Sequence, residues 1–336
     1  MASPRPSGIL IIAEIGSVHD GSFGNAKKLV ELAKACGADA VKFQTHIPEA
    51  ETLRDAPAPS YFKSEPRWEY FRRTGFSPAQ WLELKAHCDA TGIEFMSSPF
   101  SVEAVDLLAK TGMARWKIPA GEITNLPYLR KVASAGGGVI LSSGMSTWAE
   151  LDAAVEAVRG SGRLEAVLQC TSEYPCPDAK VGINVMEEIA KRYDVACGLS
   201  DHTLEIFAPI VAASRGASVV EKHLTFSRAM YGSDARHSLE PHDFKRMVEG
   251  IRAAEAMMGN RVDKDDISAF KDMKSIFEKS LVSLAAIAKG SKVTGAMLGC
   301  KKPGTGIPAA KLESYLGCTA SRDIPADKLL AEDDFI

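Results

Sequence analysis

Short apolar runs alternate with stretches of helical spacing along most of this chain, and this alternation restricts the folds that are open to it. Between the runs, segments such as 25–36, 78–91 and 147–159 carry apolar residues three and four positions apart, as amphipathic helices do. Because the runs are continuously apolar, they predict parallel strands that are buried on both faces. The runs cover residues 9–15, 40–43, 93–96, 115–118, 138–141, 166–169, 196–199 and 218–221.

Eight strand–helix units within about 260 residues predict a (β/α)₈ TIM barrel in the α/β class. A doubly wound open sheet is the alternative. The G-x-G-x-x-G pattern that would follow the first strand of a dinucleotide-binding sheet is absent, which disfavours that version of the fold.

The connection after the second strand, residues 47–75, is long for a compact domain and holds several prolines. Two interpretations remain open: a functional lid, or a peripheral insertion with a small core of its own. Its aromatic residues are Tyr61, Phe62, Trp68, Tyr70 and Phe71.

The repeating pattern ends near residue 262, so residues 1–262 are the predicted barrel domain. Residues 263–280 are rich in Asp and Lys and predict a charged linker helix. Residues 281–336 contain short apolar stretches broken by Gly and Pro, which predict a small, mostly irregular or β domain.

Composition excludes several classes of function. The net charge of −3 and the absence of a long basic run disfavour nucleic-acid binding. No apolar stretch is long enough for a membrane span or a signal-peptide core. The 7 cysteines are scattered and form no C-x-x-C motif, so a reducing compartment is expected and the protein is predicted to be cytoplasmic.

Polar and ionisable residues follow each predicted strand, at the end of a barrel where reacting groups lie. Such groups near an apolar interior cost free energy unless they are paired or used, so we interpret the set as functional. It includes Glu14, Lys42, Gln44, Ser98, Lys117, Glu122, Ser142, Ser143, Ser172, Tyr174, Ser200, His202, Glu221, His223 and Asp234.

Two pairs within this set suggest particular chemistry. His202 and His223 end neighbouring strands and could share a divalent metal whose open shell is completed by water or substrate. Cys170 is a weaker candidate for a third ligand and fits better as a small buried residue. Lys42 and Lys117 could bind an anionic phosphate and carboxylate, or one of them could form a Schiff base, and the residues alone leave both open.

Several segments in chain order resemble the N-acetylneuraminate (sialic acid) synthase family. The tail, with KPGTGI at 302–307 and SRD at 321–323, is similar to that family's C-terminal SAF domain, the antifreeze-like fold. The barrel segments are AEIG at 13–16, KFQT at 42–45, SSPF at 97–100, KIPAGEITN at 117–125, SGMS at 143–146, CTSEYP at 170–175, GLSDHT at 198–203, EKHLT at 221–225 and SLEP at 238–241.

The resemblance implies a TIM barrel, a linker and an SAF domain that reaches across a domain-swapped homodimer. It implies condensation of phosphoenolpyruvate with an aldose, and His202 and His223 as ligands of Mn²⁺ or Mg²⁺. Glu14, Glu122 and Lys117 would be catalytic, with Glu14 handling a proton or orienting water and Glu122 orienting Lys117 or a cationic intermediate. The phosphoenolpyruvate-binding residues would be Lys42, Ser98, Lys117, Ser143, Ser172 and Ser200, and the sugar-binding residues Gln44, Tyr174, Asp234 and Lys302.

Some positions depart from the family pattern. Ala120 stands where many members have Ser, and Lys302 takes the place of an arginine, which is not equivalent at a forked contact. Segments 17–21 and 230–237 also differ. These departures leave the acceptor open among N-acetylmannosamine, its 6-phosphate, mannose and a diacetamido 6-deoxy sugar.

Three other functions compete with this one. The first is another phosphoenolpyruvate-dependent 3-deoxy-sugar-acid synthase, which the SAF-like tail disfavours. The second is a pyruvate aldolase, which would release no phosphate. The third is a non-catalytic sugar-binding barrel, which the presence of Glu14, Lys42 and both histidines disfavours.

Overall fold

The structure is a computed structural model that describes residues 8–57 and 65–336. The chain divides into two compact units, one that ends at Asn260 and one that begins at Arg261. Each unit has a hydrophobic core of its own, and each is described by itself. The aromatic residues Tyr61 and Phe62 of the long connection lie outside the described residues.

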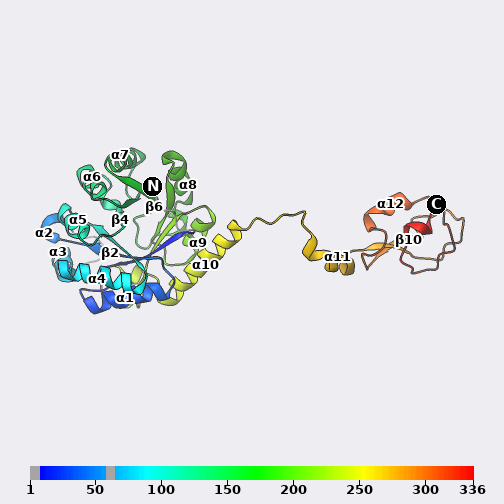
Figure 1. The fold of residues 1–336 in the computed structure, drawn as a ribbon, viewed down its shortest axis with the longest axis horizontal. Coiled ribbons are helices and arrows are strands. Elements are labelled where there is room, and N and C mark those ends of the chain that lie inside the picture. The colour runs from blue at the N-terminus through cyan, green and yellow to red at the C-terminus, as the bar shows by residue number, and fades with distance from the viewer. Residues whose placement is uncertain (1–7, 58–64) are drawn as a thin grey trace. The chain divides into compact units, whose positions relative to one another are not determined.

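The first unit is a closed barrel of eight parallel strands in chain order, surrounded by helices (Figure 1). Seven of the eight predicted runs end one to three residues before the observed strand does. The strands therefore extend into the polar residues that follow each apolar run. The strands are β1 (Leu10–Gly16), β2 (Ala40–Thr45), β3 (Glu94–Pro99), β4 (Arg115–Ile118), β5 (Gly138–Ser142), β6 (Arg163–Cys170), β7 (Ala196–Asp201) and β8 (Val219–His223).

Side chains cap the starts of several barrel helices. Ser77 and Gln80 form a capping box at the start of α4, and Thr147 and Glu150 form another at the start of α7. These boxes satisfy backbone N–H groups that the first turn leaves free. The helices are α1 (Phe23–Ala35), α4 (Pro78–Thr91), α5 (Val102–Ala109), α6 (Leu126–Ser134), α7 (Trp148–Arg159), α8 (Ile183–Tyr193), α9 (Phe207–Ser214) and α10 (Pro241–Gly259).

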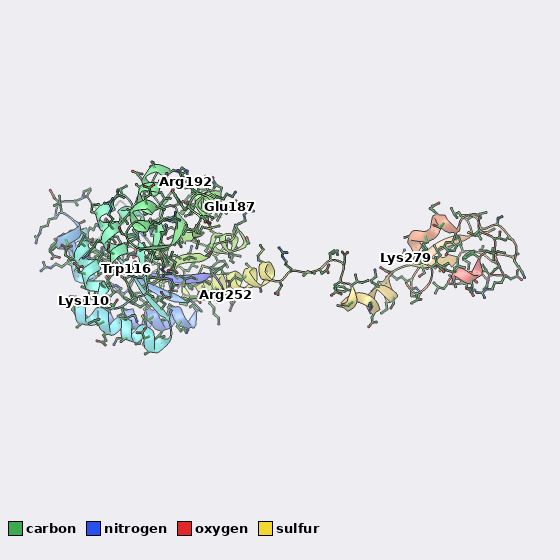
Figure 2. All side chains as sticks on the ribbon, turned by 45° about the horizontal axis from the view of Figure 1, so that its top comes forward. Lys110, Trp116, Glu187, Arg192, Arg252 and Lys279 are labelled. Carbon is green, nitrogen blue, oxygen red and sulfur yellow. The ribbon has the colours of Figure 1, made fainter. Side chains whose placement is uncertain are left out.

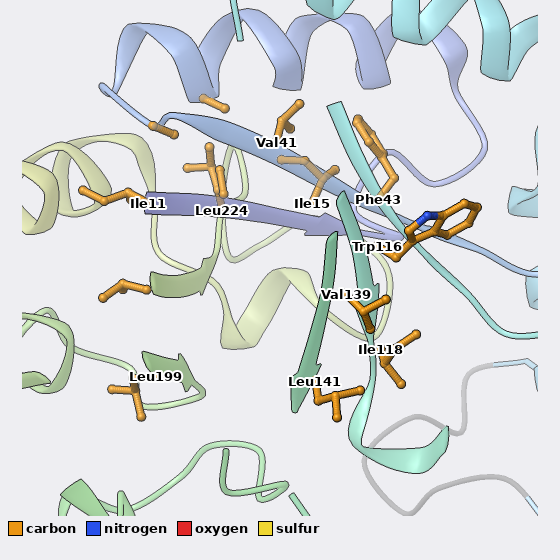
Figure 3. Packing of buried hydrophobic residues seen from close by; sticks show 14 of the residues in the cluster. Ile11, Ile15, Val41, Phe43, Trp116, Ile118, Val139, Leu141, Leu199 and Leu224 are labelled. Atoms are coloured by element: carbon orange, nitrogen blue, oxygen red, sulfur yellow. The ribbon is translucent and has the colours of Figure 1, made fainter. Parts of the chain in front are cut away.

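Alternate residues of the strands belong to two separate cores. Outward side chains such as Ile11, Val41 and Leu199 pack against the helices in the larger cluster (Figure 3). Inward side chains fill the lower part of the barrel and form a cluster of Leu10, Ile12, Ala40, Met96, Ile140, Ala166, Leu168 and Val219, which we call the interior plug. Charged side chains such as Arg192 lie on the outer helices (Figure 2).

The long connection after β2 folds into two short helices, α2 (Pro48–Glu51) and α3 (Arg67–Thr74). Trp68 and Tyr70 of α3 are buried. Phe71 stacks on His46 with 3.6 Å between ring centroids. The described part of this connection is therefore packed against the residue that follows β2.

The second unit pairs β9 (Ser280–Ser283) with β10 (Leu298–Lys301) in an antiparallel sheet and also contains α12 (Leu312–Tyr315). Much of the rest is irregular, as the Gly and Pro content predicts. Its buried Asp334 accepts hydrogen bonds from Arg322 and Lys328, at 2.7 and 2.8 Å, so this charge is paired inside the small domain.

The predicted linker helix over 263–280 is wrong in its extent. Only a 3₁₀ turn at Ser268–Phe270 and α11 (Lys271–Phe277) form. Upstream, the carboxylates of Asp263 and Asp266 accept hydrogen bonds from backbone N–H groups two residues later. These local bonds compete with helical hydrogen bonds, so the acidic residues that suggested a helix delay its start.

No helix in the described part of the chain is long and apolar enough to cross a membrane.

Candidate active site

Charged residues form a ring inside the barrel, directly above the interior plug. Strand register places Glu14 of β1 beside Lys42 of β2 on one side and beside His223 of β8 on the other. Lys42 Nζ lies 2.9 Å from Glu14 Oε2 and 3.5 Å from Glu221 Oε1, and Lys117 Nζ lies 3.2 Å from Glu221 Oε1. The side chains of Glu14, Lys42, Lys117 and Glu221, which we call the charged ring, are almost completely buried.

Burial and ion pairing act against each other on the pKa values of this ring. Burial would lower the pKa of Lys42, but Glu14 and Glu221 outweigh that effect and raise it. Burial would likewise raise the pKa of Glu221, but Lys117 and Lys42 lower it to about 2. At Lys117 the balance is reversed, because burial lowers its pKa more than Glu221 raises it.

Serine hydroxyls surround these lysines. Ser98 Oγ accepts a hydrogen bond from Lys42 Nζ at 3.2 Å, and Ser200 Oγ donates to Glu221 at 3.1 Å. Among the described residues, the buried Ser142 Oγ has no hydrogen-bond partner. Ser143 lies just beyond β5 and donates to Gln169 Oε1 at 3.1 Å. The arrangement can hold an anion between ammonium groups and hydroxyls.

Ser143, Gln169 and Cys170 line a cavity of about 490 Å³ at the ends of β5 and β6. Ser172 lies beside it, because a Cβ added at Gly144 would meet Ser172 Oγ at 2.5 Å and Cys170 Sγ at 3.2 Å. A larger cavity of about 730 Å³ lies where the strands begin, on the far side of the interior plug. None of Glu14, Lys42, Lys117 and Glu221 is among the residues that line the larger cavity.

The two predicted metal ligands face each other, with 5.8 Å between ring centroids. His202 Nδ1 donates to the Thr171 carbonyl at 2.9 Å, which leaves Nε2 with its lone pair. His223 Nδ1 is buried and has no hydrogen-bond partner among the described residues. No group of three or more His, Cys, Asp or Glu able to hold a metal occurs in the described ranges, so oxygens from water or substrate would complete the shell.

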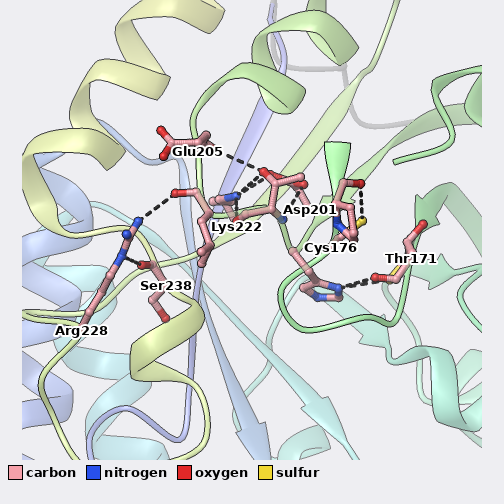
Figure 4. Close-up of polar contacts among 12 residues, drawn as sticks. Thr171, Cys176, Asp201, Glu205, Lys222, Arg228 and Ser238 are labelled. Carbon is pink, nitrogen blue, oxygen red and sulfur yellow. Dashed lines mark hydrogen bonds and ion pairs between the residues drawn. The ribbon is translucent and has the colours of Figure 1, made fainter. Parts of the chain in front are cut away.

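A buried ion pair lies behind these histidines, on the outward faces of β7 and β8 (Figure 4). Lys222 Nζ contacts Asp201 and donates to the Thr203 carbonyl at 2.6 Å. Asp201 also accepts from Thr203 N at 3.0 Å. Because each partner is next to a histidine in sequence, the pair fixes the backbone that carries His202 and His223.

The predicted sugar-binding residues of the barrel lie around the same mouth. The Tyr174 ring is 4.1 Å from that of His202. Gln44 Nε2 donates to Glu14 Oε1 at 2.7 Å, and Asp234 accepts from Ser17 N at 2.9 Å. A Cβ added at Gly16 would meet both Asp234 and Gln44, so these two side chains are neighbours.

Lys302 belongs to the second unit, where its ammonium lies 4.8 Å from the centroid of the Phe277 ring. Its predicted contact with the sugar stays a prediction.

The structure corrects one predicted contact. Glu122 does not orient Lys117, because the carboxylate beside Lys117 is Glu221 and Glu122 instead accepts from Asn125 at 3.1 Å. The chain bends into a 3₁₀ turn at Ala120–Glu122, which takes the side chain off the line of β4. Burial raises the pKa of Glu122, and the nearby Glu51 adds to the rise against the opposing Asn125 hydrogen bond.

Sequence reasoning missed the role of Glu221. Its signal is the alternation of a strand, since a residue two positions from His223 points to the same side. The strand predicted at 218–221 ends on this residue, so it was grouped with the polar ends and received no function of its own.

Comparison with known proteins gives consistent matches over both units. Residues 29–263 match the NeuB family and residues 278–336 match the SAF domain. N,N'-diacetyllegionaminic acid synthase of Campylobacter jejuni is 36% identical over 331 residues, covering 96% of this chain and 99% of the relative. N-acetylneuraminate-9-phosphate synthase of Homo sapiens is 33% identical over 297 residues, covering 87% and 82%. N-acetylneuraminic acid synthetase of Leptospira borgpetersenii has a similar solved structure, with a TM-score of 0.69, 26% identity and coverage of 80% and 90%.

Proposed function

The chain belongs to the NeuB family, and from this premise we propose that it condenses phosphoenolpyruvate with an aldose to form a nonulosonic acid and inorganic phosphate. The observation that carries the proposal is the pair of buried lysines, Lys42 and Lys117, held beside Glu14 and Glu221 at the mouth of the barrel. A substrate with a phosphate and a carboxylate offers each ammonium an anionic group, and Ser98, Ser143 and Ser200 add hydroxyl donors.

The reaction makes one C–C bond and breaks one C–O bond. C3 of phosphoenolpyruvate attacks the aldehyde carbon of the open-chain sugar, water adds at C2, and phosphate leaves from C2. One proton of the water goes to the aldehyde oxygen, and the other leaves with the phosphate as the C2 hydroxyl becomes the ketone of the product.

Glu14 is the residue placed to handle one of these protons. One of its oxygens faces Lys42 and the other accepts from Gln44, so it lies between the anion-binding and sugar-binding groups. Lys42 forms an ion pair with Glu14 and Gln44 donates to it, so both contacts are of the kind that a carboxylate accepts.

A divalent ion, Mn²⁺ or Mg²⁺, is proposed at His202 and His223. The Thr171 carbonyl fixes the ring of His202, and His223 Nδ1 has no other partner among the described side chains, so both rings fit this role. When bound, such an ion polarises a carbonyl oxygen and raises the electrophilicity of its carbon.

For the acceptor, we place a diacetamido 6-deoxy sugar first. The supporting observation is that the diacetyllegionaminic acid synthase matches a larger share of both chains, at higher identity, than the neuraminate-9-phosphate synthase does. N-acetylmannosamine, its 6-phosphate and mannose remain in the panel to be tested.

We also propose a domain-swapped homodimer in the cytoplasm. The first part of the second unit exposes the apolar side chains of Phe270, Met273 and Ile276, which a second chain could cover. All seven cysteines are free, which fits a reducing compartment.

The deciding experiment measures phosphate released from phosphoenolpyruvate with Mn²⁺ across the sugar panel. Release with one sugar, abolished by EDTA and restored by Mn²⁺ or Mg²⁺, is the expected result and identifies the acceptor. Folded protein that releases no phosphate with any of the four sugars would contradict the proposal.

A further inference from the structure

A chain of hydrogen bonds runs from the long connection into the charged ring. Glu51, the last residue of α2, contacts His46 Nδ1 at 2.8 Å. His46 Nε2 contacts Gln44 Oε1 at 3.1 Å, and Gln44 Nε2 donates to Glu14 Oε1 at 2.7 Å. The chain ends at the ion pair between Glu14 and Lys42.

The direction of every bond in this chain follows from its two ends. Glu14 is a carboxylate paired with Lys42, so it can only accept, and Gln44 must present its NH₂ group to it. The carbonyl oxygen of Gln44 therefore faces His46 and needs a donor, which fixes a proton on His46 Nε2. A second proton then lies between Nδ1 and the carboxylate of Glu51.

The surroundings hold this pair in place. The side chains of His46 and Glu51 are only 4% and 5% exposed. The His46 ring is stacked between Phe71 of α3, at 3.6 Å, and Phe100, which follows β3, at 4.1 Å between centroids. The stack holds the imidazole in one plane and so fixes the directions of its two nitrogens. A buried pair such as His46–Glu51 adds little net stability to the fold, so stability alone does not explain why it is present.

We infer that the His46–Glu51 pair positions Gln44 for the acceptor sugar. With its oxygen facing His46 and one N–H bound to Glu14, Gln44 keeps its second N–H as a donor for the sugar. Without the pair, only the contact with Glu14 would hold the amide, and Gln44 could rotate about that single bond and move its second N–H away from the sugar. His46 and Glu51 are positioning residues, and the long connection sets the geometry of the sugar site through α2 and α3. This inference rests on the proposed function.

The kinetic test uses His46→Phe, which keeps a flat ring between Phe71 and Phe100 but removes both donors. Loss of one oriented hydrogen bond should raise KM for the sugar about tenfold, with KM for phosphoenolpyruvate within about twofold of wild type. Glu51→Gln should raise KM for the sugar much less, because its NH₂ can donate to Nδ1 and preserve the order of the chain. The exposed His242 supplies the matched control, His242→Phe.

Two further measurements keep the test decisive. If His46→Phe does not fold with Glu51 left unpaired, the double variant H46F/E51M removes the buried charge as well. ¹⁵N spectra of ring-labelled histidine test the pair without turnover: His46 Nε2 should carry a proton in the wild type and in Glu51→Gln.

The outcomes separate this inference from the proposed function. A wild-type protein inactive with every sugar contradicts the function, whereas the spectra still decide the state of His46. An unchanged KM for the sugar in the folded variants, equal rises for both substrates, or an Nε2 without a proton would overturn the inference.

Discussion

At the scale of single residues, Glu14 and Glu221 form different ion pairs with the buried lysines Lys42 and Lys117. Glu221 contacts both lysines and Ser200, whereas Glu14 contacts Lys42 and Gln44. Glu221 therefore belongs to the proposed anion-binding side, and Glu14 connects that side to the proposed sugar site. The two carboxylates should respond differently to substitution.

Glu14→Gln should lower kcat by about 100-fold or more, because an amide cannot accept the proton that general base catalysis requires. The variant should stay folded, since Lys42 keeps its contacts with Glu221 and Ser98. Phosphate release and thermal unfolding measure the two effects, with Glu103→Gln on the exposed start of α5 as the control. An active variant, or one that fails to fold, would remove Glu14 from the mechanism.

His19 gives the barrel a dependence on pH. Burial lowers its pKa from 6.5 to about 4, while Asp234 and Asp20 oppose the shift and His46 adds to it. The unfolded chain therefore binds a proton that the folded barrel excludes between these values. Stability is fully present above pH 6.5 and is lost as the pH falls, by about 2 kcal/mol between pH 7 and pH 5.

Urea unfolding across this range checks the effect of His19. All 4 tryptophans precede Asn260, so their fluorescence follows the barrel alone. His19→Asn keeps an acceptor for Gly21 N–H but does not titrate. In this variant the unfolding free energy should lose about 2 kcal/mol less than in wild type between pH 7 and pH 5. The same slope in both proteins would show that other groups cause it.

At the scale of elements, the turn after β1 brings the sugar site together. Gly16 has φ of +52°, and an added Cβ would lie 2.3 Å from Asp234 Oδ2. Gly16→Ala should lower the unfolding free energy by about 1–3 kcal/mol and displace Asp234, which raises KM for the sugar.

Gly259→Ala is the matched control for this prediction. It lies in the last turn of α10, with no heavy atom within 4 Å of an added Cβ. The change there should be close to neutral or slightly stabilising. Equal losses for the two variants in chemical unfolding would show that crowding at Asp234 does not matter.

Helices and strands were predictable from the sequence where the spacing of apolar residues matches the burial that the fold requires. The runs at 40–43 and 115–118 begin where β2 and β4 begin, because continuous apolar burial leaves little choice. The polar ends of the strands were predicted as loops, since Ser200 or His223 carries no apolar signal and is kept in the strand by its neighbours. The extent of α11 depends on local carboxylate bonds that composition does not reveal.

The site was predictable as a set of residues but less so as contacts. Position at a strand end was enough to find Lys42, Lys117 and both histidines. Which carboxylate meets Lys117 depends on how the chain turns after β4, and the order Glu51–His46–Gln44 depends on a connection whose fold has no repeating pattern.

At the scale of the whole molecule, the proposed swap of the SAF domain makes each site a product of two chains. A mixture of Glu14→Gln and Lys302→Ala proteins, dissociated and reassembled, should then regain activity. In mixed dimers one barrel keeps Glu14 and receives an intact Lys302, so about a quarter of all sites are restored. Sedimentation measures the dimer, and a mixture no more active than its parts would contradict the swap.

The interior plug has a consequence for how this protein can change. The plug separates the charged ring from the opposite end of the barrel, so a side chain at the rim of the proposed sugar site can change without contact with the residues of the plug. Selection can therefore act on the rim, on positions such as Tyr174 and Asp234, while the stability of the barrel is inherited intact. A lineage built on this barrel can exchange one sugar for another in small steps, each of which leaves the catalytic carboxylates and lysines in place.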